Sequence, residues 1–195
     1  MLPARDEAMR LLEEGHARNP GPWKDHSIVT AECAYLIAQR CAGMNAEKAY
    51  ILGLLHDIGR REGVTYIAHV IDGYRYLTGL GYDEAARICI THSFARQDIN
   101  DYIGKIDITA ESFEELKTVL AGYTYDDYDR LIQLCDNIAL PSGSVPMAER
   151  IADVKNRYGY YPEAKQHKAF ELKRYFEHKS GLDIDHLNVR LNPPA

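Results

Sequence analysis

The sequence predicts an all-α protein whose helices form a single-domain bundle. Apolar residues recur at the spacing of one helix face along nearly the whole chain, and prolines and glycines separate these segments. No stretch shows the strict apolar–polar alternation of a half-buried strand. The 195 residues, of which 46% are hydrophobic, suffice for one domain with a sizeable core.

Five helices are expected in the first half of the chain, and local signals mark their ends. Pro3 begins the first helix, and Asn19-Pro20-Gly21-Pro22 ends it because two prolines and a glycine cannot continue a helix. Asn45 is placed to be the N-cap of the third helix, and Gly59 is placed to end it. The expected helices cover residues 3–18, 25–41, 45–58, 65–78 and 83–94.

The second half of the chain begins with a polar, irregular stretch over residues 95–110, which has one turn near residues 99–102. Ser112 with Glu115 fits a capping box for a helix that reaches Ala121. After the last helix, residues 182–195 are expected to form a loose tail that follows a domain of residues 1–181. The other helices expected here cover residues 126–140, 146–158 and 162–179.

The composition disfavours several classes of protein. Lys and Arg number 23 against 29 Asp and Glu, a net charge of −6, whereas proteins that bind extended nucleic acid usually carry a basic excess. No apolar stretch approaches the roughly 20 residues that span a bilayer, and the N-terminus lacks a signal-peptide core. We therefore expect a cytoplasmic protein without a membrane partner. Four cysteines are expected to be buried free thiols: Cys33, Cys41, Cys89 and Cys135.

The eight histidines divide into two groups by their surroundings. One group lies among charged residues and is expected on the surface; it consists of His16, His167, His178 and His186. The other group shares apolar helical segments with two aspartates, where a buried carboxylate is costly unless it is paired or bound to a metal. An isolated helical histidine is more often a core residue than a ligand, so the spacing alone leaves that alternative open. The candidate metal ligands are His26, His56, Asp57, His69, His92 and Asp136.

The segment Leu54-Leu55-His56-Asp57-Ile58-Gly59-Arg60 resembles the signature of the HD superfamily of metal-dependent phosphohydrolases. The pattern of that superfamily is an early histidine, a His-Asp doublet and a late aspartate inside a helix. His26, His56-Asp57 and Asp136 match it in order, so the resemblance covers about residues 22–140. It implies a helical bundle of the HD-domain type that hydrolyses a phosphomonoester or a phosphoanhydride.

One branch of the superfamily adds two histidines that complete a two-metal site. His69 and His92 fall in the right interval, in the order of the bacterial diadenosine tetraphosphate hydrolases. By this resemblance one metal is held by His26, His56, Asp57 and Asp136, and Asp57 bridges to a second metal held by His69 and His92. Two ions are favoured, from among Fe, Mn, Zn, Ni, Co and Mg. A one-metal nucleotidase and a non-catalytic HD domain that binds a metal or a nucleotide are the alternatives.

The resemblance also implies a small phosphate substrate, most simply a nucleotide, which is attacked by a metal-activated hydroxide. Asp57 and His56 would be central to catalysis. Arg60, Arg61 and Arg96 lie close in sequence to the expected ligands and are expected to bind phosphate. The cyclic-dinucleotide phosphodiesterase branch is disfavoured because its Gly-Tyr-Pro element is absent. The sequence leaves the substrate, the native metal and the formation of a homodimer open.

Overall fold

Helices make up most of the protein, so the predicted all-α class is confirmed. The computed structural model describes residues 1–191. Two two-residue strands, β1 (Ala139–Leu140) and β2 (Gly143–Ser144), form an antiparallel pair. The α-helices are α1 (Arg5–Arg18), α2 (Trp23–Arg40), α3 (Ala46–Leu55), α4 (Ala68–Gly79), α5 (Asp83–Thr91), α6 (Ala110–Ala121), α7 (Asp127–Asp136), α8 (Met147–Tyr158) and α9 (Glu163–Ser180). Three short 3₁₀ turns are η1 (Ile58–Glu62), η2 (Ile99–Asp101) and η3 (Ile184–His186).

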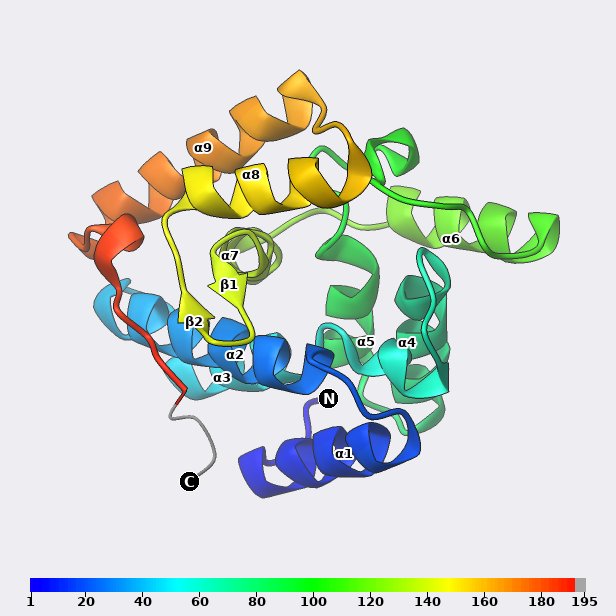
Figure 1. The fold of residues 1–195 in the computed structure, drawn as a ribbon. Helices are drawn as coiled ribbons and strands as arrows, with labels where there is room; N and C mark the ends of the chain where they lie inside the picture. The colour runs from blue at the N-terminus through cyan, green and yellow to red at the C-terminus, as the bar shows by residue number, and fades with distance from the viewer. Residues whose placement is uncertain (192–195) are drawn as a thin grey trace.

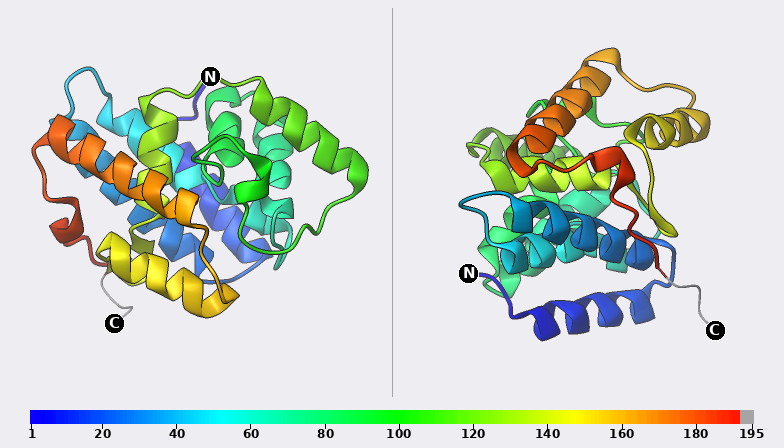
Figure 2. Two further views of the ribbon diagram at one scale, coloured as in Figure 1. Left: turned by 90° about the horizontal axis from the view of Figure 1, so that it is seen from above. Right: turned by 90° about the vertical axis from the view of Figure 1, so that its left-hand side faces the viewer.

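The α2–α3 pair lies at the centre of the bundle (Figure 1). Helix α1 covers one side of this pair, α7 and α9 pack on another, and α4 and α5 pack together beside it. Figure 2 shows α1, the α2–α3 pair and α9 at successive levels. The main core joins these layers, and a smaller apolar cluster lies between α4, α5 and α6.

Helix α3 is the most deeply buried element, because its residues from Ala49 to Leu55 are all buried. The predicted N-cap is confirmed: the Asn45 side chain accepts a hydrogen bond from the Lys48 N–H at 3.0 Å. Gly53 allows close contact with α2, since a Cβ there would lie 2.8 Å from the Ala31 Cα. An apolar helix held on all sides is a rigid support for the residues that follow it.

The end of α3 differs from the prediction. The helix stops at Leu55, and Gly59 lies inside η1 rather than ending α3. The reason is tertiary: Gly59 touches α4, where a Cβ would overlap the His69 carbonyl oxygen and lie 2.5 Å from the Gly73 nitrogen. Gly59 thus allows the close approach that holds His69 next to the His-Asp doublet.

Two other helices are shorter than predicted. Helix α5 ends at Thr91 instead of residue 94, and α7 ends at Asp136 instead of residue 140. After α7 the chain turns into β1, whose pairing with β2 replaces the expected last turn of the helix. Both early ends leave a candidate ligand at a helix terminus.

The start of α6 also differs from the expected capping box. Thr109 is the N-cap, and its side chain accepts a hydrogen bond from the Ser112 N–H at 3.1 Å. Ser112 therefore lies inside the helix, and the Glu115 carboxylate pairs with Arg75 of α4 instead of closing a capping box. The turn expected near residues 99–102 is confirmed as η2.

The chain after α9 packs against the bundle up to Leu191, so the expected loose tail is wrong for residues 182–191. Ile184 and Val189 are buried in the main core, and Gly143 pairs with Arg190 in an antiparallel bridge. The rest of the expected tail, residues 192–195, lies outside the described residues. The bundle thus extends at least ten residues beyond the predicted boundary at residue 181.

The remaining expectations about burial agree with the structure except at His16, which was expected on the surface. All four cysteines are buried and free within the described part of the chain. His167, His178 and His186 are exposed, and His16 is half-buried beside Trp23. Between residues 1 and 191, no helix has both the length and the apolar character that crossing a membrane requires.

Gly59→Ala should destabilise the protein because its Cβ collides with the α4 backbone. The expected loss is about 3 kcal/mol of unfolding free energy, since backbone on both sides must move. Urea unfolding measures it. Gly79→Ala is the matched control, because its Cβ has open space, and its effect should stay within about 1 kcal/mol. Equal effects of the two substitutions would contradict the close-contact explanation.

Candidate metal centre

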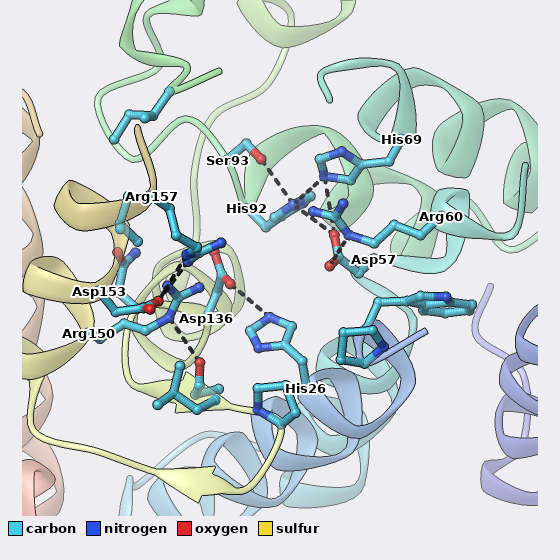
Figure 3. Close-up of a pocket in the computed structure, with 18 of the residues that line it drawn as sticks. His26, Asp57, Arg60, His69, His92, Ser93, Asp136, Arg150, Asp153 and Arg157 are labelled. Atoms are coloured by element: carbon cyan, nitrogen blue, oxygen red, sulfur yellow. Dashed lines mark hydrogen bonds and ion pairs between the residues drawn. The ribbon is translucent and has the colours of Figure 1, made fainter. Parts of the chain in front are cut away.

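Six side chains from five helices meet at one place, and most of them sit at helix ends. His26 lies in the first turn of α2, His56 and Asp57 follow α3, and His92 follows α5. His69 lies in the first turn of α4, and Asp136 is the last residue of α7. All but His56 line a cavity of about 560 Å³, and Figure 3 shows them around it.

The imidazole Nε2 atoms face the two carboxylates. The first cluster contains His26 and His56 with the carboxylates of Asp57 and Asp136. The His26 Nε2 lies 3.0 Å from the Asp136 Oδ1, and the His56 Nε2 lies 4.0 Å from the same oxygen. The His56 Nε2 also lies 3.9 Å from the Asp57 Oδ2. Asp136 therefore lies on the same side of the site as His26.

The second cluster gathers around the other oxygen of Asp57. The Asp57 Oδ1 lies 3.1 Å from the His69 Nε2 and 3.7 Å from the His92 Nε2. The two imidazole nitrogens are 3.4 Å apart. Two sets of three residues each bring their ligand atoms within 4.8 Å of one another. The first set is His26, His56 and Asp57, and the second is Asp57, His69 and His92. Asp57 therefore belongs to both sets.

Backbone carbonyls orient three of the imidazoles. The Nδ1–H of His56 donates to the Gly53 oxygen at 2.6 Å, that of His92 donates to the Ile88 oxygen at 3.0 Å, and that of His69 donates to Tyr66. A proton on Nδ1 leaves Nε2 with a lone pair, which is the form that binds a metal. Metal-binding histidines in proteins are commonly oriented by such hydrogen bonds to backbone carbonyls.

The His56 Nε2 atom gives a direct test of whether a cation fits. It is buried and has no hydrogen-bond partner among residues 1–191. An unpaired buried nitrogen is costly, and it lies among carboxylate oxygens and other imidazoles, which together are the donors that divalent transition metals prefer. The residues at this site therefore fit a divalent metal ion.

Electrostatics favour the protonation states that bind cations. Burial alone would raise the pKa of Asp57, yet the Arg60 guanidinium and the His69 imidazole hold that pKa well below its usual range. Burial would also raise the pKa of Asp136, but the hydrogen bond with His26 outweighs it and lowers that pKa. Burial lowers the pKa of His92 to about 3. At neutral pH the carboxylates are thus ionised and His92 is neutral.

The three arginines expected at the site lie in different surroundings. Arg60 lines the cavity, and its Nε–H donates to the Asp57 Oδ2 at 2.5 Å. The Arg61 guanidinium instead lies 3.8 Å from the ring centre of Tyr76, outside the cavity, because consecutive residues of a 3₁₀ turn point in different directions. Arg96 faces a second pocket and pairs with Asp101 at 3.1 Å. The expectations for Arg61 and Arg96 are therefore wrong about position.

Six polar residues of α8, of the loop after it and of the start of α9 also line the cavity, although nothing in the signature points to them. They all follow the last metal-ligand candidate. One signal was present, since three of them are spaced i, i+3 and i+7 on a single helix, but spacing does not tell which face of α8 meets the cavity. The six residues are Arg150, Asp153, Arg157, Tyr158, Tyr161 and Lys165.

A comparison with protein families agrees with the order of these residues. The profile of the HD domain matches residues 23–140, which is more than half of the chain. The chain belongs to the HD-domain family. The matched segment runs from the first residue of α2 to the end of β1 and contains all six candidate ligands of this HD domain. Helices α8 and α9 follow it. Membership supports a metal-dependent phosphohydrolase.

Two solved structures show low similarity to this HD protein. The HD domain of the L. monocytogenes phosphodiesterase PgpH is 16% identical, with a TM-score of 0.46 over 83% of this chain and 94% of that one. The same domain in complex with cyclic-di-AMP is 15% identical, with a TM-score of 0.45 over 93% of this chain and 100% of that one. None of the curated protein sequences matches the chain. The predicted diadenosine tetraphosphate hydrolase branch stays a prediction.

Divalent metal should stabilise the wild-type protein, because the ligands are assembled only in the fold. At free metal about 100-fold above its Kd, the unfolding free energy should rise by about 2.7 kcal/mol. Thermal unfolding after chelation, with and without added Mn²⁺ or Zn²⁺, measures the gain. Asp57→Ala should lose it, whereas exposed His178→Ala should keep it. A metal-dependent gain in Asp57→Ala as large as in the wild type would contradict the assignment.

Proposed function

We propose that this HD protein is a two-metal phosphohydrolase that cleaves a phosphomonoester or a phosphoanhydride bond of a small nucleotide. The observation that supports it most is the membership of Asp57 in two separate clusters of ligand atoms. Its two oxygens face different histidines, as a carboxylate that bridges two ions would require. The cavity of about 560 Å³ has the size of a small-molecule site.

In this proposal His26, His56, Asp57 and Asp136 would hold the first metal, and Asp57, His69 and His92 would hold the second. Divalent cations bound there would neutralise phosphoryl charge and lower the pKa of a coordinated water. The protein's own contribution is to place a phosphate. Arg60 is held beside the shared carboxylate and lines the cavity, where its planar fork would contact phosphate oxygens.

The surroundings of the cavity support a reaction shielded from bulk water. Trp23, Tyr102 and Ile103 line it together with the polar groups, and Trp23 and Ile103 are buried. Apolar walls lower the local dielectric, so that charges in the site interact more strongly than in water. Among the branches of the superfamily, we propose that the diadenosine tetraphosphate hydrolases are the nearest, because their histidines follow one another in the same order along the chain.

A one-metal nucleotidase is the second candidate, and one observation favours it. The unpaired buried nitrogen belongs to His56, in the first cluster. His69 and His92 contact each other and Asp57, so the second cluster is partly satisfied by the protein itself. In that case His69 and His92 would line the pocket without holding an ion.

Metal content should separate the two candidates. The wild type should bind close to two ions per chain, and both His69→Ala and His92→Ala should bind about one, because each removes a ligand of the second site only. Elemental analysis of the metal-saturated, desalted protein measures the ratio. His178→Ala is the matched control and should keep the wild-type ratio. One ion per chain in all four proteins would support the one-metal nucleotidase.

Catalysis should depend on Asp57. With Mn²⁺, Fe²⁺ or Co²⁺ present, phosphate release from at least one mononucleotide, dinucleoside polyphosphate or sugar phosphate is expected. Asp57→Ala should lower it by roughly 10³-fold or more, equivalent to about 4 kcal/mol of transition-state stabilisation. A cyclic dinucleotide should be a poor substrate, because the Gly-Tyr-Pro element is absent. Metal binding without hydrolysis of any compound would instead indicate a non-catalytic HD domain.

A further inference from the structure

A second group of charged residues faces the metal centre across the cavity. Figure 3 shows Arg150, Asp153 and Arg157 on the opposite side from His69 and His92. Lys165, at the start of α9, lines the same cavity. We call Arg150, Asp153, Arg157 and Lys165 the α8–α9 wall. All four residues follow the segment that matches the HD family, so the family resemblance assigns them no role.

The α8–α9 wall carries surplus positive charge. Asp153 is its one carboxylate, and it accepts hydrogen bonds from Arg150 at 3.0 Å and from Arg157 at 2.8 and 3.1 Å. A single carboxylate therefore serves two guanidinium groups, and Lys165 adds a third cation. Positive charge gathered on a cavity wall of an acidic protein is a local feature that its net charge of −6 hides.

Lys165 is the most informative member. Its Nζ donates to two neutral acceptors, the Ser93 oxygen at 3.1 Å and the Asp101 oxygen at 3.2 Å. No carboxylate forms an ion pair with Lys165 within residues 1–191. An ammonium group has three donors, so one remains for a ligand. Asp136 and Asp101 are near enough to interact with Lys165 electrostatically, but neither forms an ion pair with it. A lysine that is held by carbonyl oxygens and lines a cavity without an ion-paired carboxylate is suited to bind an anion.

The arginines are held in position as well. The Arg150 Nε donates to the Ala139 oxygen of β1 at 2.9 Å, which ties α8 to the end of the HD segment. Arg157 uses Nε and Nη2 for Asp153, and its side chain is 49% exposed, so Nη1 is available to a ligand. Donors that are fixed before binding lose little entropy when the ligand arrives.

We propose that the α8–α9 wall binds a second phosphate group of the substrate, through Arg157 and Lys165, while the first phosphate lies at the metal centre. The preferred substrates then carry at least two phosphate groups, and a monophosphate is bound at one end only. A guanidinium fork together with an ammonium point charge is a common pair of phosphate ligands. This inference rests on the proposed function for the position of the first phosphate.

The test compares ligands that share a nucleoside and differ in phosphate number: AMP, ADP and adenosine 3′,5′-bisphosphate. Isothermal titration calorimetry on the manganese-loaded full chain gives each Kd, and phosphate release is followed in the same samples to separate binding from turnover. At least one two-phosphate ligand should bind about tenfold more tightly than AMP, because charge-assisted hydrogen bonds contribute at about this level.

Arg157→Gln and Lys165→Gln should each remove most of that advantage. Glutamine keeps an amide donor for the protein contacts, and thermal unfolding confirms that the variants fold. Arg174→Gln removes the same charge from an exposed position of α9 and should keep the tenfold difference. No advantage in the wild type, or an equal advantage in all the variants, would overturn the second-phosphate site.

The outcomes also separate this inference from the proposed function. If no compound is hydrolysed but the advantage exists and is lost in Arg157→Gln, the second-phosphate site stands and the hydrolase proposal fails. If compounds are hydrolysed and affinity does not depend on phosphate number, the hydrolase proposal stands and the second-phosphate site fails.

Discussion

One constraint governs the structure around the site: the carboxylate of Asp57 is buried at the end of an apolar helix, and the cost of burying its charge must be offset. Helix α3 is enclosed by its neighbours, so Asp57 has little access to water. An ionised carboxylate in such a place needs partners. The Arg60 guanidinium and the His69, His92 and His56 imidazoles supply them. A bound cation would add the compensation that neutral imidazoles lack.

The local fold follows from this requirement. Helix α3 stops early, and η1 turns Arg60 back towards the carboxylate. Gly59 lets α4 come close enough to present His69. The early ends of α5 and α7 leave His92 and Asp136 at termini, from which side chains of separate helices can converge. Helix ends build this site, and the buried middle of α3 keeps it rigid.

Two regions of the chain form the cavity together. The segment that matches the HD family contains every candidate metal ligand, and helices α8 and α9, which follow it, complete the cavity. The contact of Arg150 with Ala139 and that of Lys165 with Ser93 join the two regions. Changes in α8 and α9 could therefore alter what the cavity accepts while the metal centre stays the same.

Much of the fold and the candidate site could be predicted from the sequence because the relevant signals are local or ordered. Helix periodicity, the Asn45 cap and the burial of the cysteines depend on nearby residues. The His-Asp doublet with its flanking histidines and aspartate is a linear pattern, and the structure brings all six residues together.

Tertiary structure alone decided where α3 and α7 end, because the close contact of Gly59 with α4 and the β1–β2 pair replace their expected last turns. The tertiary structure also decided which positively charged side chains face the cavity. Arg60 and Arg61 are neighbours, yet they point to different partners, and Lys165 reaches the cavity from a distant helix. The direction of a side chain depends on how its helix packs, and that packing comes from contacts far apart in the sequence.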